Sequence, residues 1–380
     1  MNAVYLDYNA TAPVKPEVAA AIARALEVVG NPSSVHSFGR AARKVVEDAR
    51  ERVAALVGAK PAEVVFTASA TEANNLVLAG AGRTRRIVTA IEHPAVLKAA
   101  QSLPGELVVL PVDGDGVVAL GALEAALADS GEPALVALML ANNETGAVQP
   151  VAEAAQLARA HGALIHCDAV QGPGRLAVSM DALGVDYLSL SAHKFAGPKG
   201  VGALIARDGA PLKPSMIGGG QERGRRAGTE NLPGIAGFGE AAWLAAQDLA
   251  NAPRLARLRD SLESRALEIE PRLHVFSAKA PRLPNTSCLT MPGVQSETQV
   301  MALDLAGVAV SAGSACSSGK VEPSHVLRAS GVADAISGCA IRVSLGWATR
   351  EEDIDAFLSV WRALYAGLTN RFRSGISGAL

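Results

Sequence analysis

The chain lacks an excess of basic residues and any hydrophobic run of membrane-spanning length. Its 35 lysine and arginine residues face 37 aspartate and glutamate residues, which gives a formal charge of −2. Without a basic surplus, bulk electrostatics do not favour nucleic acid or an anionic membrane as a partner. Apolar runs such as ALVALMLA are too short for a transmembrane helix, and the N-terminus has Asp7 in its apolar stretch and no basic leader. We therefore expect a cytoplasmic protein that acts on small molecules.

Cysteine is also scarce. Four irregularly spaced cysteines in 380 residues are too few for a disulfide framework, so reduced thiols are expected. Cys167, Cys288 and Cys339 lie in apolar, strand-like segments, where cysteine usually serves as a small core residue. Cys316 differs because it lies in SAGSACSSGK, whose small and polar residues predict a loop.

Short apolar runs alternate with helical patterns from Ala62 to about Arg207. EVVFTA is followed by TEANNLVLAG, for example, and ALVALMLA by VAEAAQLARAHG. Continuous runs of Val, Ile, Leu and Ala are typical of strands that are buried on both faces of a parallel sheet. The pattern predicts an α/β fold with a mostly parallel central sheet covered by helices, and such sheets bind ligands beyond the carboxyl ends of their strands.

A change of composition at residues 251–253 indicates a domain boundary. Beyond it, NTSCLTM, VAVSAG and AIRVSLG are strand-like, whereas SETQVMALDLAG and EEDIDAFLSVWRALYAG are helical. This is an α+β pattern. We predict a large α/β domain over residues 16–250 and a smaller α+β domain over residues 1–15 and 251–380, which carries the Cys316 loop.

The segment SLSAHKFAGPKGVGALIAR places Ser191, His193 and Lys194 at a predicted strand end. Desolvation at an apolar strand end favours a neutral amine, and a neutral amine attacks carbonyl groups. Lys194 is therefore a candidate Schiff-base former. A lysine that simply extends into solvent fits this segment equally well.

Polar residues follow three other predicted strands. VVFTASATEANN predicts a helix that begins near Thr71, with Ser69 and Glu72 at capping-box spacing, and the N-terminus of such a helix can hold a phosphate. His93 stands just before a proline that suits a first helical turn, and MLANNETG places Asn143 in a loop. Each feature alone is weak evidence for a binding site. Most capped helices, for example, bind nothing.

Asp168 ends the strand-like run ALIHCDAVQG, three residues before Gln171. A carboxylate at the edge of a ligand crevice can pair with a protonated ring nitrogen, and the Gln171 amide can donate to a phenolic oxygen. A strand-ending aspartate that caps the next turn explains Asp168 equally well. A metal site with His166 is disfavoured because no third ligand has suitable spacing.

Ten ordered motifs together resemble one enzyme family. They are YLDYNATAPV, GNPSSVHSFGR, FTASATEANN, EHPAVL, NNETGAVQP, HCDAVQ, SAHKFAGPKGVGAL, GGGQERGRRAGTEN, GSACSSG and IRVSLG. The chain is similar to the cysteine desulfurases, the group that includes the nitrogen-fixation and iron–sulfur-cluster types, from Tyr5 to about Leu364. These are class-V aminotransferase-like enzymes of fold type I. The resemblance implies a pyridoxal 5′-phosphate (PLP)-dependent transferase and a homodimer.

The resemblance also implies roles for individual residues. Lys194 would hold PLP and later move the substrate Cα proton, Asp168 would keep the ring nitrogen protonated, and His93 would stack on the ring. Arg342 would pair with the substrate carboxylate, and Asn143 would lie beside the ring oxygen and the substrate. The implied cofactor-binding residues are Ala70, Thr71, His93, Asn143, Asp168, Gln171, Ser191, His193 and Lys194, with Thr229 reaching the phosphate in the other subunit.

The implied reaction converts L-cysteine to L-alanine. Its sulfur would pass to Cys316 as a persulfide, for delivery to an iron–sulfur scaffold or another sulfur-acceptor protein. A selenocysteine lyase, or another fold-type I enzyme such as an aminotransferase, shares Lys194 and Asp168, but an aminotransferase needs no loop thiol. A binding protein that has lost its chemistry is disfavoured by the intact set Lys194, Asp168, His93 and Cys316. IGGGQERGRR lacks the pattern of a nucleotide-binding loop.

Overall fold

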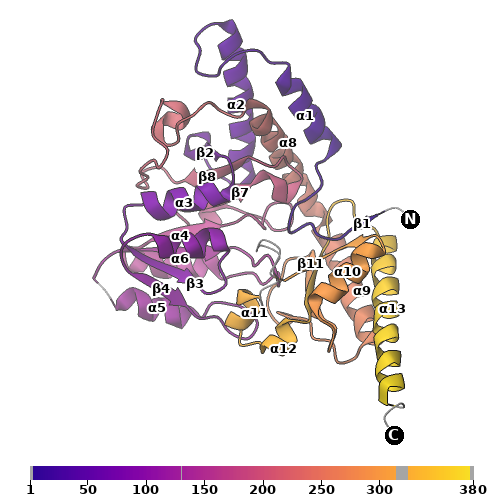
Figure 1. Ribbon diagram of the computed structural model, residues 1–380. Helices are drawn as coiled ribbons and strands as arrows, with labels where there is room; N and C mark the ends of the chain where they lie inside the picture. Colours follow the sequence, from indigo (N-terminus) through magenta and orange to yellow (C-terminus); the bar gives the residue numbers. More distant parts are fainter. Residues whose placement is uncertain (1–2, 130, 314–323, 377–380) are drawn as a thin grey trace.

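A seven-stranded sheet forms the centre of the larger part of the protein (Figure 1). The computed structural model describes residues 3–129, 131–313 and 324–376. The strand order is β2 (Val64–Thr67), β8 (Gly202–Ala206), β7 (Tyr187–Ser191), β6 (Leu164–Asp168), β5 (Ala134–Met139), β3 (Arg85–Thr89) and β4 (Leu107–Leu110). β8 is antiparallel to both of its neighbours, and the other pairs are parallel. The predicted α/β class with a mostly parallel sheet is confirmed.

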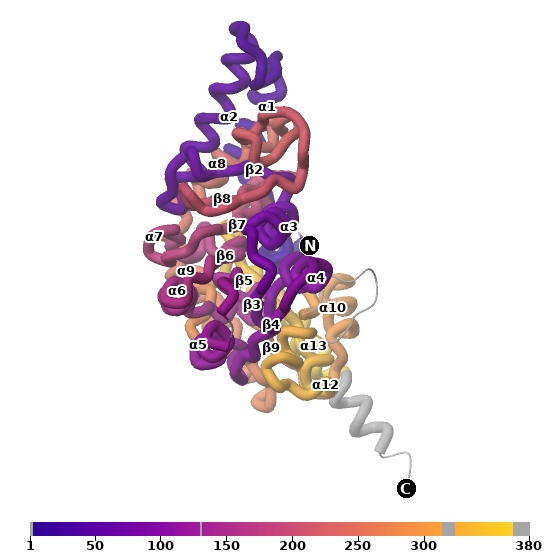
Figure 2. Tube along the Cα trace, turned by 90° about the vertical axis from the view of Figure 1, so that its left-hand side faces the viewer, coloured from indigo at the N-terminus to yellow at the C-terminus, as the bar shows by residue number. Residues whose placement is uncertain are grey.

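Helices cover both faces of this sheet, as Figure 2 shows. Successive strand residues point to opposite faces, so Val64 and Phe66 enter one core and Val65 enters the other. The first core is closed by α2 (Ser37–Leu56), α5 (Leu120–Ala128), α6 (Val151–Ala160) and α8 (Leu232–Asp248). The second is closed by α3 (Ala70–Gly80) and α4 (Pro94–Ser102). Burial on both faces explains why these strands are continuously apolar.

The carboxyl ends of six strands meet at one edge of the sheet. β2 and β7 are both antiparallel to β8 and therefore run in the same direction, which β6, β5, β3 and β4 share. The chain thus leaves the sheet on the same side after Thr67, Thr89, Leu110, Met139, Asp168 and Ser191. Parallel sheets bind ligands at such an edge.

A smaller antiparallel sheet lies beside the larger one (Figure 1). Its strands are β11 (Ser311–Ala312), β12 (Ala340–Ser344) and β9 (Thr286–Thr290), and β1 (Val4–Tyr5) pairs separately with β10 (Val308–Ala309). Leu6, Leu262, Phe357 and Trp361 belong to a separate hydrophobic core there. The helices of this part are α9 (Ala252–Ile269), α10 (Ser296–Leu305), α11 (His325–Ala329), α12 (Asp334–Ser337) and α13 (Glu351–Ile376). The exact domain division near residue 250 stays a prediction.

Two further helices, α1 (Pro16–Leu26) and α7 (Met180–Leu183), complete the larger part, where α1 packs against α8. In the described ranges, no helix combines the length and apolar character that crossing a bilayer requires.

Candidate active site

A cavity of about 240 Å³ opens at this edge, beyond the ends of β2, β3, β5, β6 and β7. Most of the predicted site residues line it, although they come from five separate segments of the chain. The predicted residues in its wall are Ala70, Thr71, His93, Asn143, Asp168, Gln171, Ser191, His193 and Lys194. Arg342 and Thr229 are not part of this wall, and Cys316 lies outside the described residues.

Lys194 lies just beyond a strand rather than at its end. β7 ends at Ser191, and residues 192–195 form a 3₁₀ turn that directs Lys194 back into the cavity. Gly197 permits this tight turn, because a Cβ there would lie 2.7 Å from the Cβ of Ala192. The Lys194 Nζ donates to the carbonyl oxygens of Asn9 at 2.8 Å and Ala10 at 3.2 Å. The amine is thus held inside the cavity by the N-terminal segment.

Asp168 ends β6 and is only 4% exposed. One carboxylate oxygen accepts from the Asn74 Nδ2 at 2.7 Å, and the other accepts from the Val170 backbone N–H at 3.3 Å. The second bond is the turn cap that the sequence analysis gave as an alternative. Asp168 therefore caps this turn and also lines the cavity. The Asn74 Oδ1 is buried and has no hydrogen-bond partner among the described residues.

The N-terminus of α3 forms another wall of the cavity. The Ser69 hydroxyl caps the helix by accepting from the Glu72 backbone N–H at 3.2 Å, which is one half of the predicted capping box. The first-turn N–H groups of a helix lack partners within the helix and carry the positive end of its dipole. Ala70 and Thr71 place this first turn at the cavity. It is a suitable cradle for a phosphate.

Two histidines in the cavity are neutral at physiological pH. Burial lowers the pKa of His93, and the positive charge of Lys194 acts in the same direction, whereas Asp168 opposes it. Burial, with the nearby lysines, lowers the pKa of His193 to about 4. His93 also caps α4, because its Nδ1 accepts the backbone N–H two residues later at 3.1 Å. Both rings therefore present neutral faces and neutral nitrogens to a ligand.

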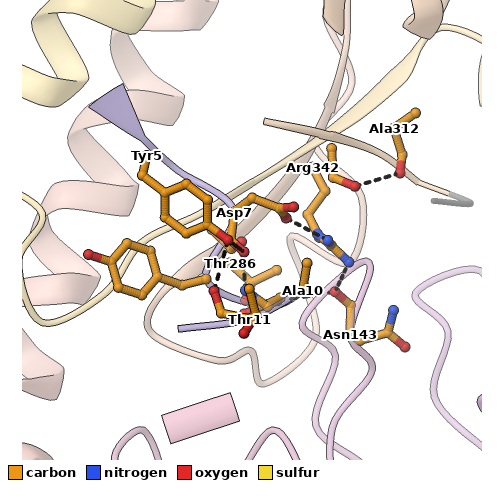
Figure 3. Close-up of polar contacts among 12 residues, drawn as sticks. Tyr5, Asp7, Ala10, Thr11, Asn143, Thr286, Ala312 and Arg342 are labelled. Atoms are coloured by element: carbon orange, nitrogen blue, oxygen red, sulfur yellow. Dashed lines mark hydrogen bonds and ion pairs between the residues drawn. The ribbon is translucent and has the colours of Figure 1, made fainter. Parts of the chain in front are cut away.

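Arg342 lies behind the cavity wall and is already bonded within the chain (Figure 3). Its Nη2 donates to the Asp7 carboxylate at 2.7 Å, and its Nη1 donates to the Asn143 carbonyl oxygen at 3.1 Å. The buried Nε has no partner among the described residues. Arg342 thus supports the loop that carries Asn143, and its predicted contact with a substrate carboxylate stays a prediction.

Thr229 lines a separate pocket together with Gly228, Glu230 and Arg226. Neither Lys194 nor Asp168 borders that pocket. Within one chain Thr229 is therefore not brought to the cavity, and its role in the site of a second subunit stays a prediction.

The residues that sequence reasoning missed are Asn9, Asn74 and Arg175. Asn74 is three residues after Thr71 on α3, so helical periodicity places both on one face and would have found it. The Asn9 carbonyl accepts from the Gln171 Nε2 at 3.1 Å as well as from Lys194. No local pattern indicates Asn9 or Arg175, because their partners are distant in the sequence or depend on a particular turn.

In the residues that the structure describes, no cluster of three or more His, Cys, Asp or Glu side chains has the arrangement of a metal site. His166 instead has its Nε2 2.9 Å from the Ser189 hydroxyl, and burial lowers its pKa to about 4. His166 is thus a buried neutral residue of the sheet.

An amine and a carboxylate that face one cavity, at the carboxyl edge of a mostly parallel sheet, are the arrangement expected of a fold-type I PLP enzyme. Comparisons with known proteins agree. The family model described as aminotransferase class-V matches residues 4–357. A curated relative from Cereibacter sphaeroides, named cysteine desulfurase, is 47% identical over 371 residues, which is 95% of each chain.

Solved structures give the same result. One titled NifS-like protein has a TM-score of 0.89 at 37% identity and covers 96% of this chain and 99% of its own. Another, titled SspA in complex with cysteine, has a TM-score of 0.78 at 30% identity and covers 90% of this chain and 98% of its own. The chain belongs to the class-V aminotransferase family and, within it, to the cysteine desulfurases.

Proposed function

We propose that this protein is a PLP-dependent cysteine desulfurase that converts L-cysteine to L-alanine and receives the sulfur on Cys316. The observation that carries the proposal is the placement of Lys194, Asp168 and the first turn of α3 around one cavity. An amine, an acid and a phosphate cradle are the three groups that PLP requires of a protein. A shared family alone does not decide the reaction, so the proposal depends on these residues.

The residues of the cavity fit the cofactor. The Lys194 amine would form its covalent link, and the first turn of α3 with Thr71 would hold its phosphate, as would Ser191 and His193. Asp168, which accepts two hydrogen bonds, would pair with a protonated ring nitrogen. When bound, PLP supplies an electron-withdrawing ring that stabilises negative charge at the substrate Cα.

The chain's own groups would perform the remaining work. Lys194, as a free amine, would take the proton from Cα, and the neutral His93 ring would stack against the cofactor face. The Cys316 thiolate would then attack the substrate sulfur, so that an S–S bond forms while the Cβ–S bond breaks and its electron pair stays with the carbon fragment. Protonation of that fragment gives alanine, and a persulfide remains on Cys316.

The substrate and the partners follow from the same proposal. Arg342, which donates to the Asn143 carbonyl, would pair with the substrate carboxylate, and Asn143, which lines the cavity, would lie beside the substrate. The working unit would be a homodimer in which Thr229 serves the other subunit. The persulfide would be delivered to an iron–sulfur scaffold or another sulfur-acceptor protein, in the cytoplasm.

The test is incubation of the purified protein with PLP and L-cysteine, followed by quantification of alanine and of persulfide on Cys316. Lys194→Ala should abolish both products, and Cys316→Ser should abolish persulfide transfer. Cys339→Ser is a matched control, because Cys339 is buried and remote from the cavity wall, and it should leave both products unchanged. Borohydride reduction and peptide mapping should place the cofactor on Lys194.

Three outcomes would contradict the proposal. Absence of alanine from the wild-type reaction would exclude desulfuration. Turnover of amino acids with a keto acid that Cys316→Ser leaves intact would identify an aminotransferase instead. A clear preference for selenocysteine over cysteine in the same assay would identify the selenium-specific alternative.

A further inference from the structure

Arg175 is a buried arginine for which the proposed reaction has no use. It is 7% exposed, and in the described residues its hydrogen bonds all go to neutral oxygen atoms. Burial, together with the charge of Arg342, lowers the pKa of Arg175 to about 9, so it remains a cation at neutral pH. A buried cation without a carboxylate partner is costly, so a specific role is needed to explain it.

A tight turn after β6 brings the Arg175 guanidinium into hydrogen-bond contact with Gln171. The backbone N–H of Arg175 donates to the Gly172 carbonyl at 3.0 Å, and Gly174 has a positive φ of 74°. A Cβ on Gly172 would lie 2.6 Å from the Val178 side chain, so the turn also packs closely. Arg175 is therefore fixed in place by the backbone as well as by its own bonds.

The guanidinium determines the orientation of the Gln171 amide. Arginine only donates hydrogen bonds, so the amide atom that faces Arg175 must be the Oε1. The Asn9 carbonyl only accepts, so it must face the Nε2, which lies 3.1 Å away. Because these two constraints agree, the orientation of the Gln171 amide is fixed, and Gln171 forms part of the cavity wall.

The same guanidinium also binds the backbone that carries the reactive amine. Its Nη2 donates to the Lys194 carbonyl at 3.1 Å and to the Tyr8 carbonyl at 3.3 Å. Arg175 thus joins the turn with Gln171, the 3₁₀ turn with Lys194 and the N-terminal segment. Two of these segments, those with Gln171 and Lys194, line the cavity.

We propose that Arg175 is a positioning residue that acts through Gln171, so that the amide donates to the phenolic oxygen of the bound cofactor and favours its anionic form. The inference rests on the proposed function. A hydrogen bond from a cation to the Oε1 polarises the amide and makes its N–H a stronger donor. The positive charge itself acts in the same direction in a site of low dielectric.

The test is a pH titration of the visible absorption band of the PLP-loaded protein. Removing the charge and weakening the amide donor makes it easier for the nitrogen that links Lys194 to the cofactor to keep its proton. Arg175→Met should therefore raise the midpoint of the titration by about 1 pH unit, a tenfold change in the equilibrium. Arg175→Lys, which keeps the charge and one donor, should stay near the wild type.

Arg86→Met is the matched control. Arg86 is 4% exposed and also donates to backbone carbonyls, those of Leu78 at 3.3 Å and Pro104 at 3.0 Å, but it does not border the cavity. Arg86→Met should lower the thermal stability, as Arg175→Met should, but it should leave the midpoint of the titration unchanged.

Gln171→Met gives a second route that leaves Arg175 in place. It should raise the midpoint in the same way, and adding Arg175→Met to it should raise the midpoint little further, because the effect passes through one amide. If Arg175→Met does not fold, a wild-type midpoint in Gln171→Met overturns the proposal.

A wild-type midpoint in Arg175→Met also overturns the proposal. So does a double variant whose shift equals the sum of the two single shifts. A wild-type protein that binds no PLP would overturn the proposed function, whereas a normal band that Arg175→Met leaves unchanged overturns this inference alone.

Discussion

Glu92 is a carboxyl group buried behind the strand ends that form the cavity wall. Its Oε1 accepts from the Thr89 hydroxyl at 2.7 Å and from the Met139 backbone N–H at 2.9 Å. Its Oε2 has no partner in the described residues. Burial raises the pKa of Glu92 from its usual 4.5 to about 8. Between these values the folded protein holds a proton that the unfolded chain has released, so rising pH lowers the stability.

Glu92→Gln removes this titration while keeping the shape of the side chain. The variant should match the wild type near pH 5 and should be more stable than it at pH 8, by on the order of 2 kcal/mol. Chemical denaturation between pH 5 and pH 8 measures the difference. Glu51→Gln removes a carboxylate from an exposed position and is the control for the change in net charge. Parallel curves for wild type and Glu92→Gln would contradict the prediction.

At this scale the sequence predicted residues that carry an obvious chemical group at a strand end. Lys194 and Asp168 are examples, since each follows an apolar run. The sequence did not predict Asn74 or Arg175, because each of them acts by a hydrogen bond to another residue of the site. Asn74 matters through Asp168, 94 residues away, and Arg175 through the Oε1 of Gln171. Only the folded chain shows those pairs.

The N-terminus of α3 is held in place by a close contact with β8. A Cβ on Gly202 would lie 2.7 Å from the Ser69 carbonyl carbon and 2.9 Å from the Ala70 nitrogen. These are backbone atoms, which do not yield as the end of a flexible side chain does. The first turn of α3 can therefore occupy its place at the cavity only because residue 202 is glycine.

Gly202→Ala should push this turn out of place. We expect a loss of stability of about 1–3 kcal/mol from overpacking, and weaker PLP binding because the phosphate cradle moves. Denaturation and PLP titration measure the two effects. Gly121→Ala, in the open first turn of α5, should instead leave PLP binding unchanged and stabilise the protein slightly. Unaltered PLP affinity in Gly202→Ala would show that the contact does not control the cradle.

The direction of β8 illustrates what element patterns can and cannot predict. Only residues 192–201 connect β7 to β8, and a parallel crossover needs a dozen or more residues, so the antiparallel pairing follows from the length of the connection. The residue at which β7 ends does not follow from the length of this connection. The sequence analysis placed His193 and Lys194 at the end of the strand, but residues 192–195 form a 3₁₀ turn, with Gly197 packed closely on Ala192.

At the scale of the whole molecule, the N-terminal segment joins the two sheets. Asn9 is fully buried, and its Nδ2 donates to the Thr286 hydroxyl at 2.8 Å and to the Asn143 carbonyl at 3.1 Å. Thr286 belongs to the small sheet and Asn143 to a loop of the large one. These contacts span more than 130 residues, so neither composition nor periodicity indicates them. The sequence motifs predicted most of the residues in the cavity wall. The joining of the two sheets beside the cavity depends on long-range hydrogen bonds such as those of Asn9.

The separation of Thr229 from the cavity allows a direct test of the homodimer. If Thr229 completes the site of the partner subunit, Thr229→Ala and Lys194→Ala damage different members of each shared site. In a mixed dimer, one site combines the intact Lys194 of one chain with the intact Thr229 of the other. Mixing the two impaired variants under conditions that exchange subunits should therefore restore about a quarter of the wild-type alanine production.

Three controls establish that recovered activity comes from mixed dimers. Each variant alone should be impaired, and a mixture of Lys194→Ala with the double variant Lys194→Ala/Thr229→Ala should recover nothing, because no chain supplies the amine. The recovery should also disappear when the subunits are covalently cross-linked before mixing. If the two single variants exchange subunits and still recover no activity, Thr229 acts within its own chain or not at all. The pocket around Thr229 would then have no part in a shared site.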